Sequence, residues 1–177
     1  MKRFRSTVLA AALSTVVTTV ATLVPVAPAS ALPAWQDRAT SWTNPAAKAP
    51  QVRDLRYATH PRFDRVVLDI KGRIPSGRAR YQRRFHEDGS GHLVPIRGRS
   101  GIALVLMPAY AHNANGDNVY DGPRIARPRF DTLKALAFTG DFEGQVSFGF
   151  ALTHRAEYRI FRLHDPQRLV IDFRHAR

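Results

Sequence analysis

Two segments of this 177-residue chain have nearly the same sequence, and they lie close to the two ends of its expected folded part. One is Arg65-Val66-Val67-Leu68-Asp69-Ile70, and the other is Arg168-Leu169-Val170-Ile171-Asp172-Phe173. In both, β-branched and large apolar residues alternate with a period of two, which is typical of a half-buried β-strand. The repeated pattern therefore predicts a β domain whose two halves use one strand design. It contains no nucleophile, metal-ligand cluster or phosphate-binding loop.

The polar residues of these two segments share the strand face opposite the predicted core: Arg65, Asp69, Arg168 and Asp172. An antiparallel pairing with Val67 opposite Val170 would place each arginine across from an aspartate of the other strand. We interpret the four residues as cross-strand ion pairs on an exposed face, each worth about 0.2–1 kcal/mol. Their predicted role is structural.

Residues 1–31 have the organisation of a secretory signal peptide. Three basic residues come first, an uncharged stretch follows from Ser6 to Val26, and Ala29-Ser30-Ala31 is a small-x-small cleavage site. The alternative is a retained membrane anchor, because the uncharged stretch is just long enough to span a bilayer. Cleavage would leave 146 residues starting at Leu32, enough for one domain with a real core, and no later segment is apolar enough to span a membrane.

The chain has no cysteine and a net charge of +13, of which the basic residues before Ser6 supply three. An exported protein without disulfides must be held by packing alone. Outside a cell, the polyanions that a basic protein meets are cell-wall polymers and anionic lipid head groups rather than nucleic acid. The alternative explanation is that the excess of arginine merely follows from a GC-rich coding sequence.

Residues 32–50 are rich in Ala, Pro, Ser and Thr and are predicted to form a flexible linker. Trp35 and Trp42 are unusual there, and the sequence leaves open whether they dock on the domain. The rest of the chain consists of short alternating segments separated by Gly, Pro and Asp turns. These segments predict strands over residues 52–58, 65–71, 78–85, 92–96, 102–107, 145–153, 158–163 and 168–173. Residues 131–138 fit a short helix or a strand. The spacing favours an all-β fold, an antiparallel sandwich or barrel over residues 51–175.

The unit Asp165-Pro166-Gln167-Arg168-Leu169-Val170-Ile171-Asp172-Phe173 resembles the closing strand of AMIN domains, a proline-containing turn followed by Arg-hydrophobic-Val-hydrophobic-Asp. The segment from Arg56 to Ile70 resembles the strand near the start of that family. The insertion Asp141-Phe142-Glu143-Gly144 is more similar to the AMIN-like domains of exported actinobacterial proteins. The resemblance covers roughly residues 50–175, nearly the whole chain after the linker.

AMIN domains are non-catalytic β-sandwich modules that occur on cell-wall amidases and secretins and direct them to peptidoglycan. The resemblance therefore implies a secreted or envelope-located module, not an enzyme, which binds peptidoglycan or an anionic wall polymer and has other envelope proteins as further partners. Two other classes stay open: a small secreted hydrolase whose site the sequence does not reveal, and an adaptor for a membrane surface or a protein partner. The oligomeric state is not predicted.

The best candidates for ligand binding are arginines, since the guanidinium group matches carboxylates and phosphates. Arg78, Arg80 and Arg84 share one face of the expected 78–85 strand, with Arg83 interrupting its apolar face, and Arg97 and Arg99 lie in the turn that follows. An ordinary solvated charged surface is the competing explanation for each one.

We expect no metal site and no cofactor. The seven histidines are dispersed without zinc-ligand spacing. The oxygen-rich loop from Asn113 to Asp121 has side chains that calcium prefers, but it departs from the EF-hand pattern and lacks a closing glutamate, so a plain polar loop is favoured.

Overall fold

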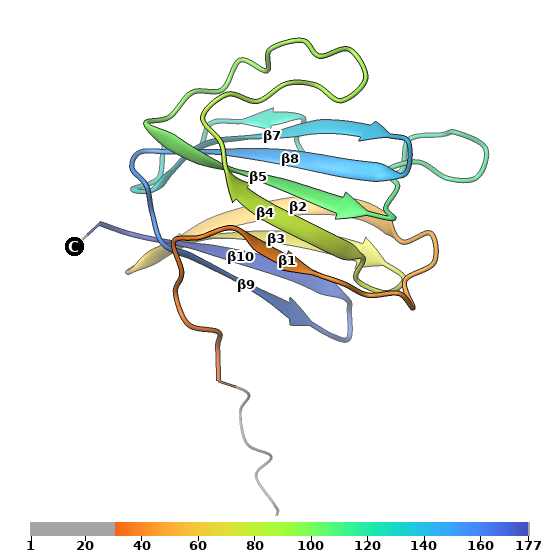
Figure 1. Ribbon diagram of the computed structural model, residues 1–177, viewed down its shortest axis with the longest axis horizontal. Coiled ribbons are helices and arrows are strands. Elements are labelled where there is room, and N and C mark those ends of the chain that lie inside the picture. Colours follow the sequence, from red (N-terminus) through yellow and green to blue (C-terminus); the bar gives the residue numbers. More distant parts are fainter. Residues whose placement is uncertain (1–30, 177) are drawn as a thin grey trace, which may run out of the picture. The chain divides into compact units, whose positions relative to one another are not determined.

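The computed structural model describes residues 31–176, and the predicted signal peptide lies, apart from Ala31, outside this range. All the regular secondary structure in the described part of the chain is β-strand (Figure 1). In order they are β1 (Thr40–Trp42), β2 (Gln51–His60), β3 (Phe63–Lys71), β4 (Ser76–Tyr81), β5 (Ser100–Met107), β6 (Ile125–Ala126), β7 (Leu133–Phe142), β8 (Gln145–Leu152), β9 (Tyr158–Leu163) and β10 (Arg168–Arg174). The ambiguous 131–138 segment is thus part of a strand, not a helix.

The strands form two antiparallel sheets that pack face to face, so the predicted antiparallel β-sandwich is confirmed. One sheet has six strands in the order β1-β4-β5-β8-β7-β6, and the other has four in the order β2-β3-β10-β9 (Figure 1). The main core between them takes alternate residues from each strand: Val66, Leu68 and Ile70 from β3, Leu169, Ile171 and Phe173 from β10, and Phe148 and Phe150 from β8 are all buried. Period-two alternation therefore places the apolar side chains where the sequence predicts them.

The two matched segments are neighbours at the centre of the four-stranded sheet. Val67 pairs with Val170 and Arg65 with Asp172, which is the register that the sequence predicts. Arg65 donates two hydrogen bonds to the carboxylate of Asp172, from Nε at 2.6 Å and from Nη2 at 2.9 Å.

The second expected ion pair, between Arg168 and Asp69, does not form. Asp69 instead accepts two hydrogen bonds from Arg56 of β2, at 2.9 and 2.7 Å. The Nε of Arg168 donates to the carbonyl oxygen of Pro166. The physical reason is that β3 has a partner on each side, and the prediction considered only β10. A carboxylate in a central strand can form an ion pair with an arginine from either adjacent strand.

Asp172 is fully buried, whereas the sequence suggested an exposed pair. A second arginine, Arg159 of β9, reaches the same carboxylate at 2.7 Å. The guanidinium of Arg159 lies 4.3 Å from the ring centre of Trp35, and that of Arg65 lies 5.0 Å from the Phe63 ring. One carboxylate is thus enclosed by two arginines that are themselves stacked on aromatic rings.

Residues 32–50 are part of the fold, which corrects the prediction of a flexible linker. Gln36 exchanges backbone hydrogen bonds with Tyr158 of β9 (3.0 and 2.8 Å), and β1 pairs with β4 of the other sheet. Trp42 packs against the core and donates from Nε1 to the carbonyl oxygen of Pro75. The segment therefore lies along both sheets at one side of the sandwich. Its two tryptophans dock on the domain, and this apolar burial gives a Pro- and Ser-rich stretch a fixed path.

A buried carboxylate joins the two sheets near the start of β7. Asp64 is fully buried in β3 and accepts hydrogen bonds from the backbone N–H groups of Thr132 (2.8 Å) and Leu133 (2.7 Å). The hydroxyl of Thr59 donates to it at 2.8 Å, and Nε2 of His175 lies 3.0 Å away. Four polar partners compensate this burial, which explains why an aspartate is tolerated in the interior.

Candidate functional site

The segment between β4 and β5 folds back over the outer face of the six-stranded sheet. The sequence suggested that the 78–85 segment is one strand and that 92–96 is another. Instead β4 ends at Tyr81, and the only pairing near residue 92 is an isolated bridge between His86 and Leu93. We call residues 82–99 the covering loop.

The covering loop lies on this face because the strands beneath it carry small residues. Phe85, Val94 and Ile96 pack on alanines of β5, β7 and β8 and form a second, smaller core. A side chain at Gly149 of β8 would place its Cβ 2.6 Å from the Phe85 ring. The absence of a side chain at Gly149 therefore lets the aromatic ring of Phe85 pack directly on the backbone of β8.

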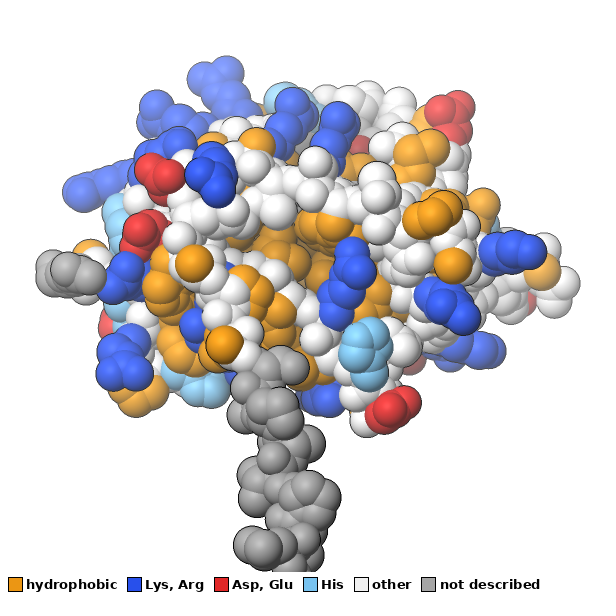
Figure 2. All heavy atoms as spheres, turned by 60° about the horizontal axis from the view of Figure 1, so that its bottom comes forward, with side chains coloured by type: hydrophobic (Ala, Val, Ile, Leu, Met, Phe, Trp, Pro, Cys, Tyr) orange, Lys and Arg blue, Asp and Glu red, His pale blue; other side chains and the backbone are white. Residues whose placement is uncertain are grey.

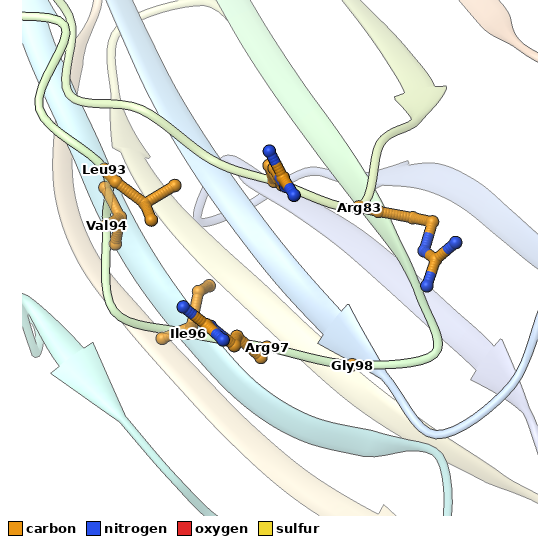
Figure 3. A pocket seen from close by; sticks show the side chains of 7 residues that line it. Arg83, Leu93, Val94, Ile96, Arg97 and Gly98 are labelled. Atoms are coloured by element: carbon orange, nitrogen blue, oxygen red, sulfur yellow. The ribbon is translucent and has the colours of Figure 1, made fainter.

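A hollow of about 570 Å³ is enclosed by the covering loop itself, since all the residues that line it belong to this loop (Figure 3). Its lining combines three arginines with apolar side chains and one glycine: Arg83, Arg84, Arg97, Leu93, Val94, Ile96 and Gly98. In Figure 3 the labelled Leu93 and Val94 lie at one end, Arg83 lies at the other, and Arg97 lies beside Ile96. We call this the arginine hollow.

The three arginines of the hollow are exposed, and none forms an ion pair with an acidic residue among residues 31–176. Like charges held together without counter-ions attract an anion. A guanidinium group binds a carboxylate or phosphate through paired, charge-assisted hydrogen bonds. The arrangement can bind anions, and the hollow contains no general base or nucleophile.

The structure distributes the five predicted ligand-binding arginines over three places. Arg84 and Arg97 come together in the arginine hollow, although the sequence assigned them to a strand and a turn. Arg78 and Arg80 are exposed on β4 and do not line this hollow. Arg99 lines a different hollow.

Arg83 is a member of the site that sequence reasoning did not select. Strand periodicity assigned it to the apolar face, opposite Arg84, but periodicity ceases to apply once β4 ends at Tyr81. A usable signal was available: an arginine on the apolar face of a strand is unfavourable, and the better explanation is that the strand has already ended.

Figure 2 shows a different face of the molecule, with Lys and Arg side chains around a central hydrophobic area and few acidic side chains. A hollow of about 500 Å³ is lined by Glu87, Asp88 and Asp141 among others. His112 contacts Asp141 there, with Nδ1 and Oδ2 2.5 Å apart. Arg124 also lines this hollow, so acidic and basic side chains occur side by side there.

The Asn113–Asp121 loop is held by its own hydrogen bonds. The side-chain oxygen of Asn113 accepts from the backbone N–H groups of Asn115 and Asp117, both at 2.9 Å. This is the local bonding that asparagine makes in turns. The part of the chain that the structure describes contains no group of three His, Cys, Asp or Glu side chains placed to share a metal ion. That this is a plain polar loop rather than a calcium site stays a prediction.

The fold places the chain in the class of antiparallel β-sandwich domains. A family model described as the AMIN-like domain matches residues 50–175, and the chain belongs to that family. The resemblance of the two matched strands to AMIN domains is confirmed in this form. No curated protein and no solved structure matches the chain.

The family suggests a peptidoglycan-related binding module, of a kind that is generally non-catalytic and extracytoplasmic. Among residues 31–176, no helix has the length and hydrophobicity to cross a bilayer. The actinobacterial origin and the signal-peptide cleavage remain predictions.

Proposed function

We propose that this protein is exported and binds the bacterial cell wall through the arginine hollow, without catalysing a reaction. Its ligand is peptidoglycan or an anionic wall polymer, and its position is outside the cytoplasmic membrane. The observation that carries the proposal is the set of three arginines with no acidic partner in the described chain, gathered over an apolar floor. Membership of the AMIN-like family supports the wall as the place where their anionic ligand is found.

The arginine hollow suits this task for two physical reasons. Guanidinium groups bind carboxylates and phosphates through two parallel hydrogen bonds, and the wall presents carboxylates on peptides and phosphates on polymers. The covering loop is held in place by the buried ring of Phe85 and by a hydrogen bond from Nη2 of Arg127 to the carbonyl oxygen of Pro95 (2.8 Å). A site held in this way loses little conformational entropy when it binds.

Sedimentation with insoluble peptidoglycan tests the proposal. The protein from Leu32, which forms one compact unit, should sediment with the wall. Changing Arg83, Arg84 and Arg97 to serine should remove most of the bound fraction and leave the β-type circular dichroism unchanged. The matched control changes Arg62, Arg73 and Arg162, which are exposed and form no ion pair among residues 31–176. This control removes the same charge from other places.

Equal loss of binding by both triple variants would mean that net charge alone attracts the protein to the wall. Failure of the unchanged protein to sediment would contradict the function itself. Salt gives an independent measure, because exposed charges are screened beyond about 8 Å at physiological ionic strength. The bound fraction should fall as salt rises, and it should fall more steeply for the unchanged protein than for the Arg83, Arg84 and Arg97 variant.

A further inference from the structure

A second basic hollow includes Arg99, the last residue of the covering loop. It has a volume of about 520 Å³ and is lined by Arg99, Arg129, Phe130, Lys134 and Thr153. Gly98 lines the arginine hollow and Arg99 lines the second one, and a Cβ at Gly98 would come within 2.2 Å of the carbonyl oxygen of Leu152. The backbone at this point lies directly against the end of β8.

The cations of this second hollow lack acidic partners among residues 31–176. The nearest acid in sequence is Asp131, whose carboxylate lies 3.6 Å from Nδ1 of His175. Arg99, Arg129 and Lys134 are all exposed and therefore accessible to a ligand. An aromatic ring, Phe130, is placed among them and contacts Tyr57 on β2 with ring centres 6.1 Å apart.

The turn before β7 fixes these side chains in position. The N–H of Phe130 donates to the carbonyl oxygen of Leu133 at 3.0 Å. Thr153 anchors the turn from β8, since its hydroxyl donates to the carbonyl oxygen of Asp131 at 2.7 Å and its N–H donates to that of Thr132 at 2.9 Å. Arg129 and Phe130 are thus presented by a braced turn rather than by a mobile loop.

Arg129 has a φ of +56°, in the left-handed region that glycine adopts most easily. An arginine there is disfavoured by its own Cβ, and residues held in such conformations concentrate at functional sites. Conformational strain and unpaired charge therefore coincide at one residue. A glycine would adopt this φ without strain, but it would lack the guanidinium group that Arg129 provides.

We propose that this second hollow binds a sugar ring that carries an anionic group. The aromatic ring of Phe130 offers an apolar surface on which the carbon face of a sugar packs, and the surrounding cations bind a carboxylate or phosphate attached to it. A cavity of this volume lies in the range of small-molecule sites. The inference rests on the proposed function, because the cell wall is the source of such sugars, and it adds a ligand class and a second subsite.

The test measures binding of three sugars to the protein from Leu32 by titration calorimetry or by NMR. N-Acetylmuramic acid carries a carboxylate, N-acetylglucosamine 6-phosphate carries a phosphate, and N-acetylglucosamine is the neutral control. At least one anionic sugar should bind roughly tenfold more tightly than the neutral one, as expected for a charge-assisted hydrogen bond. The preferred anionic sugar identifies the source, peptide-bearing glycan or phosphate polymer. Equal affinity for all three sugars, or equal affinity for inorganic phosphate alone, would overturn the proposal.

The variant Arg129→Gly separates binding from folding. It should lower the affinity for the anionic sugar by roughly tenfold, while the melting temperature stays the same or rises because the positive φ no longer carries a side chain. The control Arg73→Gly removes an exposed arginine elsewhere and should leave the affinity unchanged. Unchanged sugar affinity in Arg129→Gly would overturn the assignment.

Failure of this inference can be distinguished from failure of the proposed function. If no anionic sugar binds but the unchanged protein still sediments with the wall, only the sugar subsite is wrong. If an anionic sugar binds and the Arg83, Arg84 and Arg97 variant sediments as well as the unchanged protein, the arginine hollow is not the wall site and the second hollow stands alone.

Discussion

The two matched strands make a sharp prediction about stability, because their equivalent aspartates lie in very different environments. Asp172 is fully buried and binds both Arg65 and Arg159, whose side chains are 27% and 11% exposed. Among residues 31–176, Asp69 pairs only with Arg56, whose side chain is 56% exposed. Changing Asp172 to alanine leaves two partly buried arginines facing each other without a carboxylate.

Removing one partner of a buried ion pair costs about 3–5 kcal/mol. The aromatic rings over both arginines retain part of their stabilisation, so we expect the low end for Asp172→Ala, about 3 kcal/mol. The matched variant Asp69→Ala breaks an exposed pair and should cost less than about 1 kcal/mol. Urea unfolding followed by circular dichroism measures both, and the melting temperature of Asp172→Ala should fall by roughly 10 °C. Equal costs for the two variants would refute the reasoning that burial, not the sequence motif, sets the value of these ion pairs.

Three further outcomes follow from the structure. Phe85→Ala should destabilise the protein by about 3–5 kcal/mol or release the covering loop, and wall sedimentation should fall with it; intact sedimentation would show that the loop needs no anchor. Asp64→Ala leaves two backbone N–H groups between the sheets without their acceptor and should cost several kcal/mol, each unpaired buried group contributing about 1–3 kcal/mol in the same urea experiment. Burial raises the pKa of Tyr81 to about 12 and also raises that of Tyr158. The stability that these two buried neutral tyrosines contribute should be complete below pH 10, the ordinary tyrosine pKa, and should decline as pH rises toward 12. A urea midpoint that stays constant between pH 10 and pH 12 would contradict this expectation.

Much of the fold follows from the sequence because alternation with a period of two is a strong local signal. It gives the strands of the core and, through the matched charges, the register in which Val67 meets Val170. The signal is weak where burial comes from a distant segment. Residues 32–50 read as a linker by composition, yet Gln36 bonds to Tyr158, 122 positions further along the chain.

The candidate site was predictable only in part for the same reason. Arginine content indicated anion binding, and two of the five candidates meet in the arginine hollow. The covering loop that brings them together depends on small residues such as Gly149 in β8 accepting the ring of Phe85. This match between a small and a large residue spans 64 positions and has no local periodicity. The positive φ of Arg129 could not be predicted either, because it is set by the braced turn around this residue.

The central claim is that the wall is bound at the arginine hollow, and NMR with soluble wall fragments tests it most directly. Titration of labelled protein should shift the amide signals of the covering loop around Arg83, Arg84 and Arg97 first, with little change around Arg62, Arg73 and Arg162. Uniform small shifts at basic residues over the whole surface, or shifts that leave the covering loop unchanged, would contradict the account.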